Sequence, residues 1–293
     1  MTDRPARRGW AGVRAAAGAA ILAVVVWRLG AGPFVAATRA VDGPALAAAL
    51  GIGALTTLCC AWRWRAIAAS LGVTLPLGGA VAAYYRSQFL NATLPGGVIG
   101  DVHRAVRHGR EIGDVRLGVR AVIIERLAAQ PVHLGVAVVV LCAFPSPLRP
   151  YMPAVVLAVA AVGLVTFLVT RRRTGSSRLD RRAWAGVTAA TVVVLLGHLA
   201  TFLVAARAVG ATAPLTRLIP LTLLALLAMA LPLNLAGWGP REGVAAWAFG
   251  AAGLTAAQGV AVAVTYGVLA LVACLPGAVV LVAWSARWGG TRG

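Results

Sequence analysis

The sequence predicts an all-α polytopic membrane protein with about six transmembrane helices and two re-entrant hairpins, each returning to the side it entered from. Of its 293 residues, 60% are hydrophobic and only 12% are charged, which is too little polar surface for a soluble domain. The mean hydropathy is +0.85, and several apolar stretches approach or exceed the ~20 residues that cross ~30 Å of hydrocarbon. The alternative is that both hairpins cross fully, which would give about eight crossings.

The full spans are expected, in chain order, at residues 11–28, 44–62, 118–142, 153–170, 184–207 and 256–285. The first resembles a signal peptide but has no convincing cleavage site, so it is taken as a retained helix. Segments 76–94 and 98–114 form one hairpin around a Pro-Gly-Gly break, and segments 214–233 and 241–250 form the other around a Gly/Pro break. The chain is thus expected to be one transmembrane domain over residues 1–293.

The net charge of +19 gives the orientation of the chain rather than a nucleic-acid partner, because the arginines lie in short loops between apolar spans. With the N-terminus in the cytoplasm, most loop arginines are inside, above all in 171–182, and Arg39, Arg149 and Arg217 are outside. A full crossing by 76–94 would place the arginines of 104–116 outside, against this bias. We therefore expect a plasma-membrane protein with both termini in the cytoplasm.

The absence of lysine excludes two kinds of chemistry. A Walker-type ATP site needs Gly-Lys-Ser/Thr, and a Schiff base needs a lysine amine. The four cysteines have no metal-ligand spacing and are interpreted as small apolar residues. His133 and His198 are interpreted as packing or hydrogen-bonding residues, so the sequence predicts no metal site and no cofactor.

The two breaks share the pattern L-P-x4-G-x3-R, which runs from Leu94 to Arg104 and again from Leu231 to Arg241. In the expected topology the two hairpins enter from opposite sides, so the halves, about 44–142 and 184–285, form an inverted repeat of the kind found in secondary transporters. Irregular backbone at membrane depth is tolerated where it lines a cavity or is buried in protein. The break residues are Pro95, Gly96, Gly97, Gly100, Pro232, Gly237, Gly239 and Pro240.

Each break is expected to restart a helix whose N-terminus, with an arginine one turn later, attracts an anion. Helix N-termini bind anions and guanidinium binds phosphate through two hydrogen bonds. Arg104 and Arg241 are therefore predicted to hold a phosphate group together. The alternative is that Asp101 and Glu242 only complement the helix dipoles and pair with nearby arginines.

Two further polar groups lie within apolar segments. Tyr84, Ser87, Gln88 and Asn91 share one helical face beside Arg86 and are expected to line a cavity. Glu125 and Arg126 lie inside a span, where ionisable residues are costly and usually functional. A structural ion pair with a hairpin is the other interpretation of these two residues.

Three blocks of sequence, YYRSQFLNATLPGGVIGDVHR (84–104), IIERL (123–127) and LPLNLAGWGPRE (231–242), resemble the lysylphosphatidylglycerol synthase transmembrane-region family of flippase-like proteins. The resemblance covers about residues 45–285 and implies translocation of a lipid between leaflets. No soluble synthase domain follows the last span, so aminoacyl transfer is not implied. The segment Trp238-Gly239-Pro240 is bulkier than the small residues that the resemblance leads us to expect there. The positions that match the family pattern are Arg86, Asn91, Pro95, Gly100, Asp101, Arg104, Glu125, Arg126, Pro232, Gly237, Gly239, Arg241 and Glu242.

The expected function is flipping or scrambling of a phosphate-bearing lipid, such as an aminoacylated phospholipid or a polyprenol-phosphate or glycolipid, with no ATPase or other enzymatic activity of its own. One alternative is a non-catalytic membrane partner of a glycosyltransferase or lipid synthase. A membrane enzyme acting on a lipid phosphate is disfavoured, because no carboxylate–histidine set has catalytic spacing. The expected substrate-binding residues are Arg86, Asn91, Asp101, Arg104, Glu125, Arg126, Arg241 and Glu242.

Overall fold

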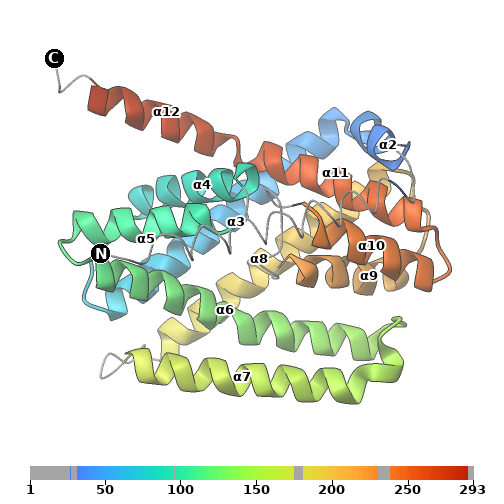
Figure 1. Cartoon of the computed structure of the whole chain (residues 1–293), viewed down its shortest axis with the longest axis horizontal. Helices are drawn as coiled ribbons and strands as arrows, with labels where there is room; N and C mark the ends of the chain where they lie inside the picture. The colour runs from blue at the N-terminus through green and yellow to red at the C-terminus, as the bar shows by residue number, and fades with distance from the viewer. Residues whose placement is uncertain (1–26, 28–31, 95–96, 175–180, 230–237, 290–293) are drawn as a thin grey trace.

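The computed structural model describes residue 27 and residues 32–94, 97–174, 181–229 and 238–289, whose regular elements are helices (Figure 1). In chain order they are α2 (Gly32–Ala40), α3 (Gly43–Ser70), α4 (Leu77–Thr93), α5 (Ile99–Glu111), α6 (Val115–Ala143), the 3-10 turn η1 (Arg149–Tyr151), α7 (Met152–Thr174), α8 (Arg181–Ala208), α9 (Leu215–Ala228), α10 (Pro240–Ala251), α11 (Ala256–Cys274) and α12 (Pro276–Gly289).

In the described part of the chain, five helical stretches are long and apolar enough to cross a bilayer. They are Gly43–Ser70, Val115–Ala143, Arg149–Thr166, Arg181–Ala208 and Ala256–Val282. The prediction of an all-helical, multi-span membrane protein is therefore confirmed. The first predicted span, 11–28, lies outside the described residues apart from Trp27.

Three spans begin at a side chain that caps the helix. A carboxylate oxygen of Asp42 accepts a hydrogen bond from the Ala45 N–H (2.8 Å), and Asp114 does the same for Leu117 (3.0 Å). The Thr255 hydroxyl accepts from the Gln258 N–H (3.1 Å) at the start of α11. Caps of this kind satisfy backbone donors that have no partner within the helix, so they fix where each span starts.

The helix order repeats along the chain. The long helix α3 is followed by the short α4 and α5 and then by the long α6; after α7, the long α8 is followed by the short α9 and α10 and then by α11. In both series the predicted break falls between the two short helices, and 95–96 and 230–237 of these breaks lie outside the described residues. The first helices of the two series, α3 and α8, pack along each other (Figure 1).

The predicted last span, 256–285, is two helices rather than one. Leu275 separates α11 from α12, and Pro276 is the first residue of α12. Proline lacks the N–H that would continue the hydrogen bonds of α11, but it suits the first position of a new helix. The interruption lets α12 leave the bundle alongside α4 (Figure 1).

The core is built largely from small side chains. Its largest cluster joins α8, α9, α10 and α11 around Phe202, which stacks on Tyr266 with ring centroids 4.5 Å apart. Many of its other members are alanines, which let helices approach closely where lipid gives no hydrophobic drive for association. By contrast, α7 packs on α6 at the edge of the bundle and exposes residues such as Leu157 and Leu164, as a lipid-facing helix does.

Candidate functional site

The first break brings α5 unusually close to α4. A β-carbon on Gly100 would overlap the backbone carbonyl of Ser87, so only glycine permits this packing. The side-chain oxygen of Asn91 accepts a hydrogen bond from the Gly100 N–H (2.7 Å), near the start of α5. The predicted helix N-terminus is therefore present, but α4 itself supplies an acceptor for it.

Asp101, in the first turn of α5, accepts hydrogen bonds at both of its carboxylate oxygens. Its Oδ1 accepts from the Ser87 hydroxyl (3.2 Å) and from Arg104 Nη2 (3.1 Å). Its Oδ2 accepts from Asn91 Nδ2 (3.1 Å) and from Arg126 of α6. One carboxylate thus ties α4, α5 and α6 together.

Glu125 of α6 is fully buried, with 0% of its surface exposed. It accepts hydrogen bonds from Arg63 Nε (2.8 Å) and from Arg104 Nη2 (3.1 Å). Arg63 also donates to the Thr191 hydroxyl of α8 (3.1 Å). Charged side chains from three helices therefore form one connected cluster, buried except for the half-exposed Arg126, which we call the Arg104 network: Arg63, Asp101, Arg104, Glu125 and Arg126.

Arg63 is the member of this network that the sequence did not indicate. The span expected at 44–62 ends just before Arg63, whereas α3 continues to Ser70 and holds Arg63 on its buried side. Trp62 and Trp64 flank Arg63, and tryptophan beside arginine is typical of the membrane–water interface, so the sequence suggested that the helix ends there. A signal was available, because no glycine or proline follows until Gly72.

Arg104 lies between two aromatic rings. Its guanidinium carbon is 4.5 Å from the centroid of the Trp64 ring and 4.0 Å from that of the Tyr84 ring. Such cation–π contacts hold the planar guanidinium in one orientation and strengthen when they are shielded from water. The side chain is only 1% exposed, so its charge is stabilised by these rings and by Asp101 and Glu125.

The polar stripe on α4 holds helices together. Tyr84 contacts Arg104, while Ser87 and Asn91 donate to Asp101. The Gln88 side-chain oxygen accepts from the Thr57 hydroxyl of α3 (2.9 Å). These four side chains therefore face α3 and α5.

The second break ends in a smaller cluster at the start of α10. Gly239 has a φ of 114°, which only glycine adopts readily, and Pro240 follows as the first residue of the helix. Glu242 accepts hydrogen bonds from the Gly239 N–H (2.7 Å) and from Arg241 Nε (2.8 Å). The ring centroids of Trp238 and Tyr266 both lie 5.1 Å from the Arg241 guanidinium carbon, so two aromatic rings pack against this arginine.

The two arginines predicted to share a phosphate lie in different clusters. Among the described residues, no hydrogen bond, ion pair or ring contact joins the Arg104 network to the pair Arg241–Glu242. In Figure 1, α5 lies toward the left and α10 toward the right. Each arginine has its own carboxylate partner, so joint binding of one phosphate stays a prediction. Pro95, Gly96, Pro232 and Gly237 lie outside the described residues.

Among the described residues, the remaining titratable groups do not assemble into a metal site. In the part of the chain that the structure describes, no three His, Cys, Asp or Glu side chains are placed to hold a metal ion. His198 Nδ1 lies 3.0 Å from the Tyr266 hydroxyl and so joins α8 to α11. This histidine has the hydrogen-bonding contact expected from the sequence.

A multi-span helical bundle that buries charged residues defines the class: a polytopic membrane protein with ion pairs in its interior. The chain belongs to the lysylphosphatidylglycerol synthase transmembrane-region family, whose model, described as the lysylphosphatidylglycerol synthase TM region, matches residues 13–278. The resemblance seen in the three motif blocks is thereby confirmed. No protein of curated function matches the chain.

Proposed function

We propose that this protein moves a phosphate-bearing lipid between the two leaflets of the plasma membrane, by flipping or scrambling and without hydrolysing ATP. The Arg104 network carries this proposal. It buries Arg63, Arg104 and two carboxylates inside the bundle at a break between two short helices, and Arg126 pairs with Asp101 from a half-exposed position. The arginines outnumber the carboxylates within the network, which favours an anionic ligand.

The energetic cost of such a network favours a function beyond folding. Each buried ion loses several kcal/mol of hydration, and ion pairing offsets this loss only when the geometry is good. Ionisable groups inside membrane segments commonly mark substrate or ion pathways. Arg104 and Glu125 are almost completely buried, so they are stable only while their partners are in place.

A route for the lipid headgroup follows from the repeated helix order. We infer that α4–α5 and α9–α10 are re-entrant hairpins that enter from opposite sides and form an inverted repeat, in which broken helices meet near the midplane. Rocking of one half against the other would then expose the interior to each leaflet in turn. We place both termini and the 171–182 loop in the cytoplasm, on the arginine distribution.

Family membership supports the choice of a lipid. The matching family is named for the membrane region of a synthase that acts on a phospholipid. An aminoacylated phospholipid and a polyprenol-phosphate or glycolipid both carry a phosphate that arginines of this network could bind. We assign the protein no catalytic step.

Liposomes with the purified full chain test the proposal. We expect faster appearance of a fluorescent phosphate-bearing lipid in the opposite leaflet than in protein-free liposomes. A labelled diacylglycerol cannot be used because it crosses unaided, so a labelled neutral glycosyl-diacylglycerol is the phosphate-free comparison. Equal rates with and without protein for every phosphate-bearing lipid tested would contradict the proposed function.

A further inference from the structure

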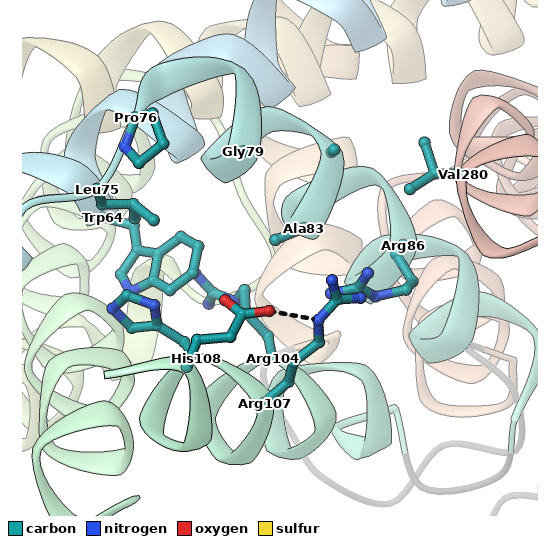
Figure 2. Close-up of a pocket in the computed structure, with 12 residues that line it drawn as sticks. Trp64, Leu75, Pro76, Gly79, Ala83, Arg86, Arg104, Arg107, His108 and Val280 are labelled. Carbon is teal, nitrogen blue, oxygen red and sulfur yellow. Dashed lines mark hydrogen bonds and ion pairs between the residues drawn. The ribbon is translucent and has the colours of Figure 1, made fainter. Parts of the chain in front are cut away.

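A pocket of about 420 Å³ lies beside the Arg104 network, between α4 and α5 (Figure 2). The end of α3, the 71–76 connection and α12 complete its wall. A volume of this size lies in the range of small-molecule sites and exceeds what a single phosphate needs. One part of the wall is apolar and is formed by Leu75, Pro76, Gly79, Ala82, Ala83 and Val280.

The other part of the wall includes nitrogen groups of Arg86, Arg104, Trp64 and His108 for which the described residues supply no hydrogen-bond partner. Arg86 and Arg104 line the pocket, and they are 4% and 1% exposed. No described group accepts a hydrogen bond from Arg86 Nε, or from Nε and Nη1 of Arg104. The same holds for the indole N–H of Trp64, and Nε2 of His108 also has no described partner. Leaving buried donors unsatisfied costs about 1–3 kcal/mol each, more for charged groups, so this wall is suited to an acceptor-rich ligand.

The charges in the pocket favour an anion. Figure 2 shows Arg86 of α4 and Arg107 of α5 reaching toward each other, although like charges repel. Arg107 pairs with the half-exposed Glu111 (2.7 Å), whereas no described carboxylate forms an ion pair with Arg86. At the other end, His108 lies edge-on to Trp64, with ring centroids 5.1 Å apart. A phosphate between Arg86 and Arg107 would relieve the repulsion and supply several acceptor oxygens.

We propose that this pocket, the α4–α5 pocket, binds the phosphate of a lipid headgroup, with Arg86 as the principal charged contact and the apolar wall against the first carbons of the lipid. The inference rests on the proposed function for the source of the phosphate. It places the anion within the first half of the chain, next to the Arg104 network, instead of between Arg104 and Arg241. Binding of the phosphate in this pocket does not require the backbone N–H groups at the start of α5.

Binding can be measured without transport, using the full chain purified in a maltoside detergent, which contains no phosphate. Dioctanoyl phosphatidic acid is the lipid probe, dioctanoylglycerol its phosphate-free match, and inorganic phosphate the free anion. Isothermal titration calorimetry reports the affinity. We expect saturable binding of the phosphatidic acid, at least about tenfold weaker binding of inorganic phosphate, and no binding of dioctanoylglycerol. Inorganic phosphate binding as tightly as the lipid would overturn the lipid assignment.

Variants locate the site. Arg86→Gln should weaken phosphatidic acid binding about tenfold or more, because a charge-assisted contact is lost. Arg110→Gln makes the same charge change on the exposed face of α5 and should leave binding unchanged. Glu111→Gln removes the only acidic side chain lining the pocket among the described residues and should strengthen binding. Ala83→Leu fills the pocket without altering charge and should weaken binding even if Arg86→Gln fails to fold.

Wild-type affinity in both Arg86→Gln and Ala83→Leu would overturn the inference, as would the absence of phosphatidic acid binding to the wild-type chain. The outcome is separable from that of the liposome assay. Transport that persists in a protein whose pocket does not bind the probe would refute the pocket and keep the function. Binding without transport would refute the function and keep the pocket.

Discussion

At the scale of single residues, Glu125 holds the Arg104 network together. It pairs with Arg63 of α3 and Arg104 of α5, and none of its surface is exposed. Each of the two guanidinium groups would lose an ionic partner if the carboxylate were removed. The remaining groups, Thr191 for Arg63 and Asp101 for Arg104, could compensate only in part.

Glu125→Gln should therefore lower the free energy of unfolding by about 3–5 kcal/mol, the range for breaking a buried ion pair. Glu111→Gln is the matched control, because Glu111 forms an exposed pair with Arg107 of the kind worth about 0.3–0.5 kcal/mol. The destabilisation by each variant is measured from the apparent unfolding midpoint of the purified protein, followed by tryptophan fluorescence. Similar shifts for the two variants would show that the network does not stabilise the bundle.

The residue scale also shows where sequence-based prediction stops. Asp101, Arg104, Glu125 and Arg126 were recognisable because ionisable residues in apolar segments stand out. The pairing of these residues could not be recognised from the sequence, because the partners lie far apart in the chain. Arg63 and Glu125, for example, are 62 positions apart. Arg63 was missed because a charge next to the expected end of a span is consistent with a loop.

At the scale of helices, the spacing between α4 and α5 depends on Gly100. The backbone of α5 lies against the Ser87 carbonyl, and this approach positions Asp101 for its contacts with Ser87 and Asn91. Any larger residue at position 100 must move α5 away from α4. The network and the α4–α5 pocket both depend on that distance.

Gly100→Ala should destabilise the protein by about 1–3 kcal/mol, the range for forcing an extra carbon into a packed interior. Gly51→Ala inside α3 is the control, because a β-carbon there meets open space and alanine is the better residue in a helix interior, by about 0.5–1 kcal/mol. Thermal unfolding of the two variants in detergent should give shifts of opposite sign. A Gly100→Ala protein as stable as the wild type would contradict this interpretation of the break.

Helix boundaries were predicted well where the length of an apolar segment alone determines them. The expected span 118–142 is α6, Val115–Ala143, because apolar length alone marks it. The separation of α11 from α12 was not predicted, although Pro276 is the residue that marks it. Proline is tolerated within membrane helices, as Pro131 in α6 and Pro220 in α9 show, so its presence does not decide between continuation and a new start.

At the scale of the whole molecule, the two halves share a helix order but differ in charge. The first half contains the Arg104 network and the α4–α5 pocket, whereas the described part of the second break has the single pair Arg241–Glu242. The sequence repeat predicted equivalent roles for Arg104 and Arg241. The structure instead surrounds Arg104 with partners from α3 and α6 that Arg241 lacks among the described residues.

The orientation of the molecule is open to direct measurement. Native Cys142 is exposed at the end of α6, on the side that the arginine distribution places outside, while position 176 lies in the loop placed inside. In intact cells, a membrane-impermeant thiol reagent should label Cys142 and should not label Ser176→Cys in a chain whose native cysteines are replaced. Labelling at position 176 without permeabilisation would refute the topology.

The most direct test of the central claim is the rate at which reconstituted protein moves a fluorescent phosphate-bearing lipid across liposomes, compared between the wild type, Arg104→Lys and Arg104→Gln. Lysine keeps the charge but loses the planar fork that binds phosphate through two hydrogen bonds, so we expect the rate to fall in Arg104→Lys and to fall further in Arg104→Gln. Arg110→Gln, exposed on the same helix, should match the wild type. If Arg104→Gln folds, inserts normally and moves the lipid at the wild-type rate, the buried network serves only to hold the helices together, and the proposed function loses its basis.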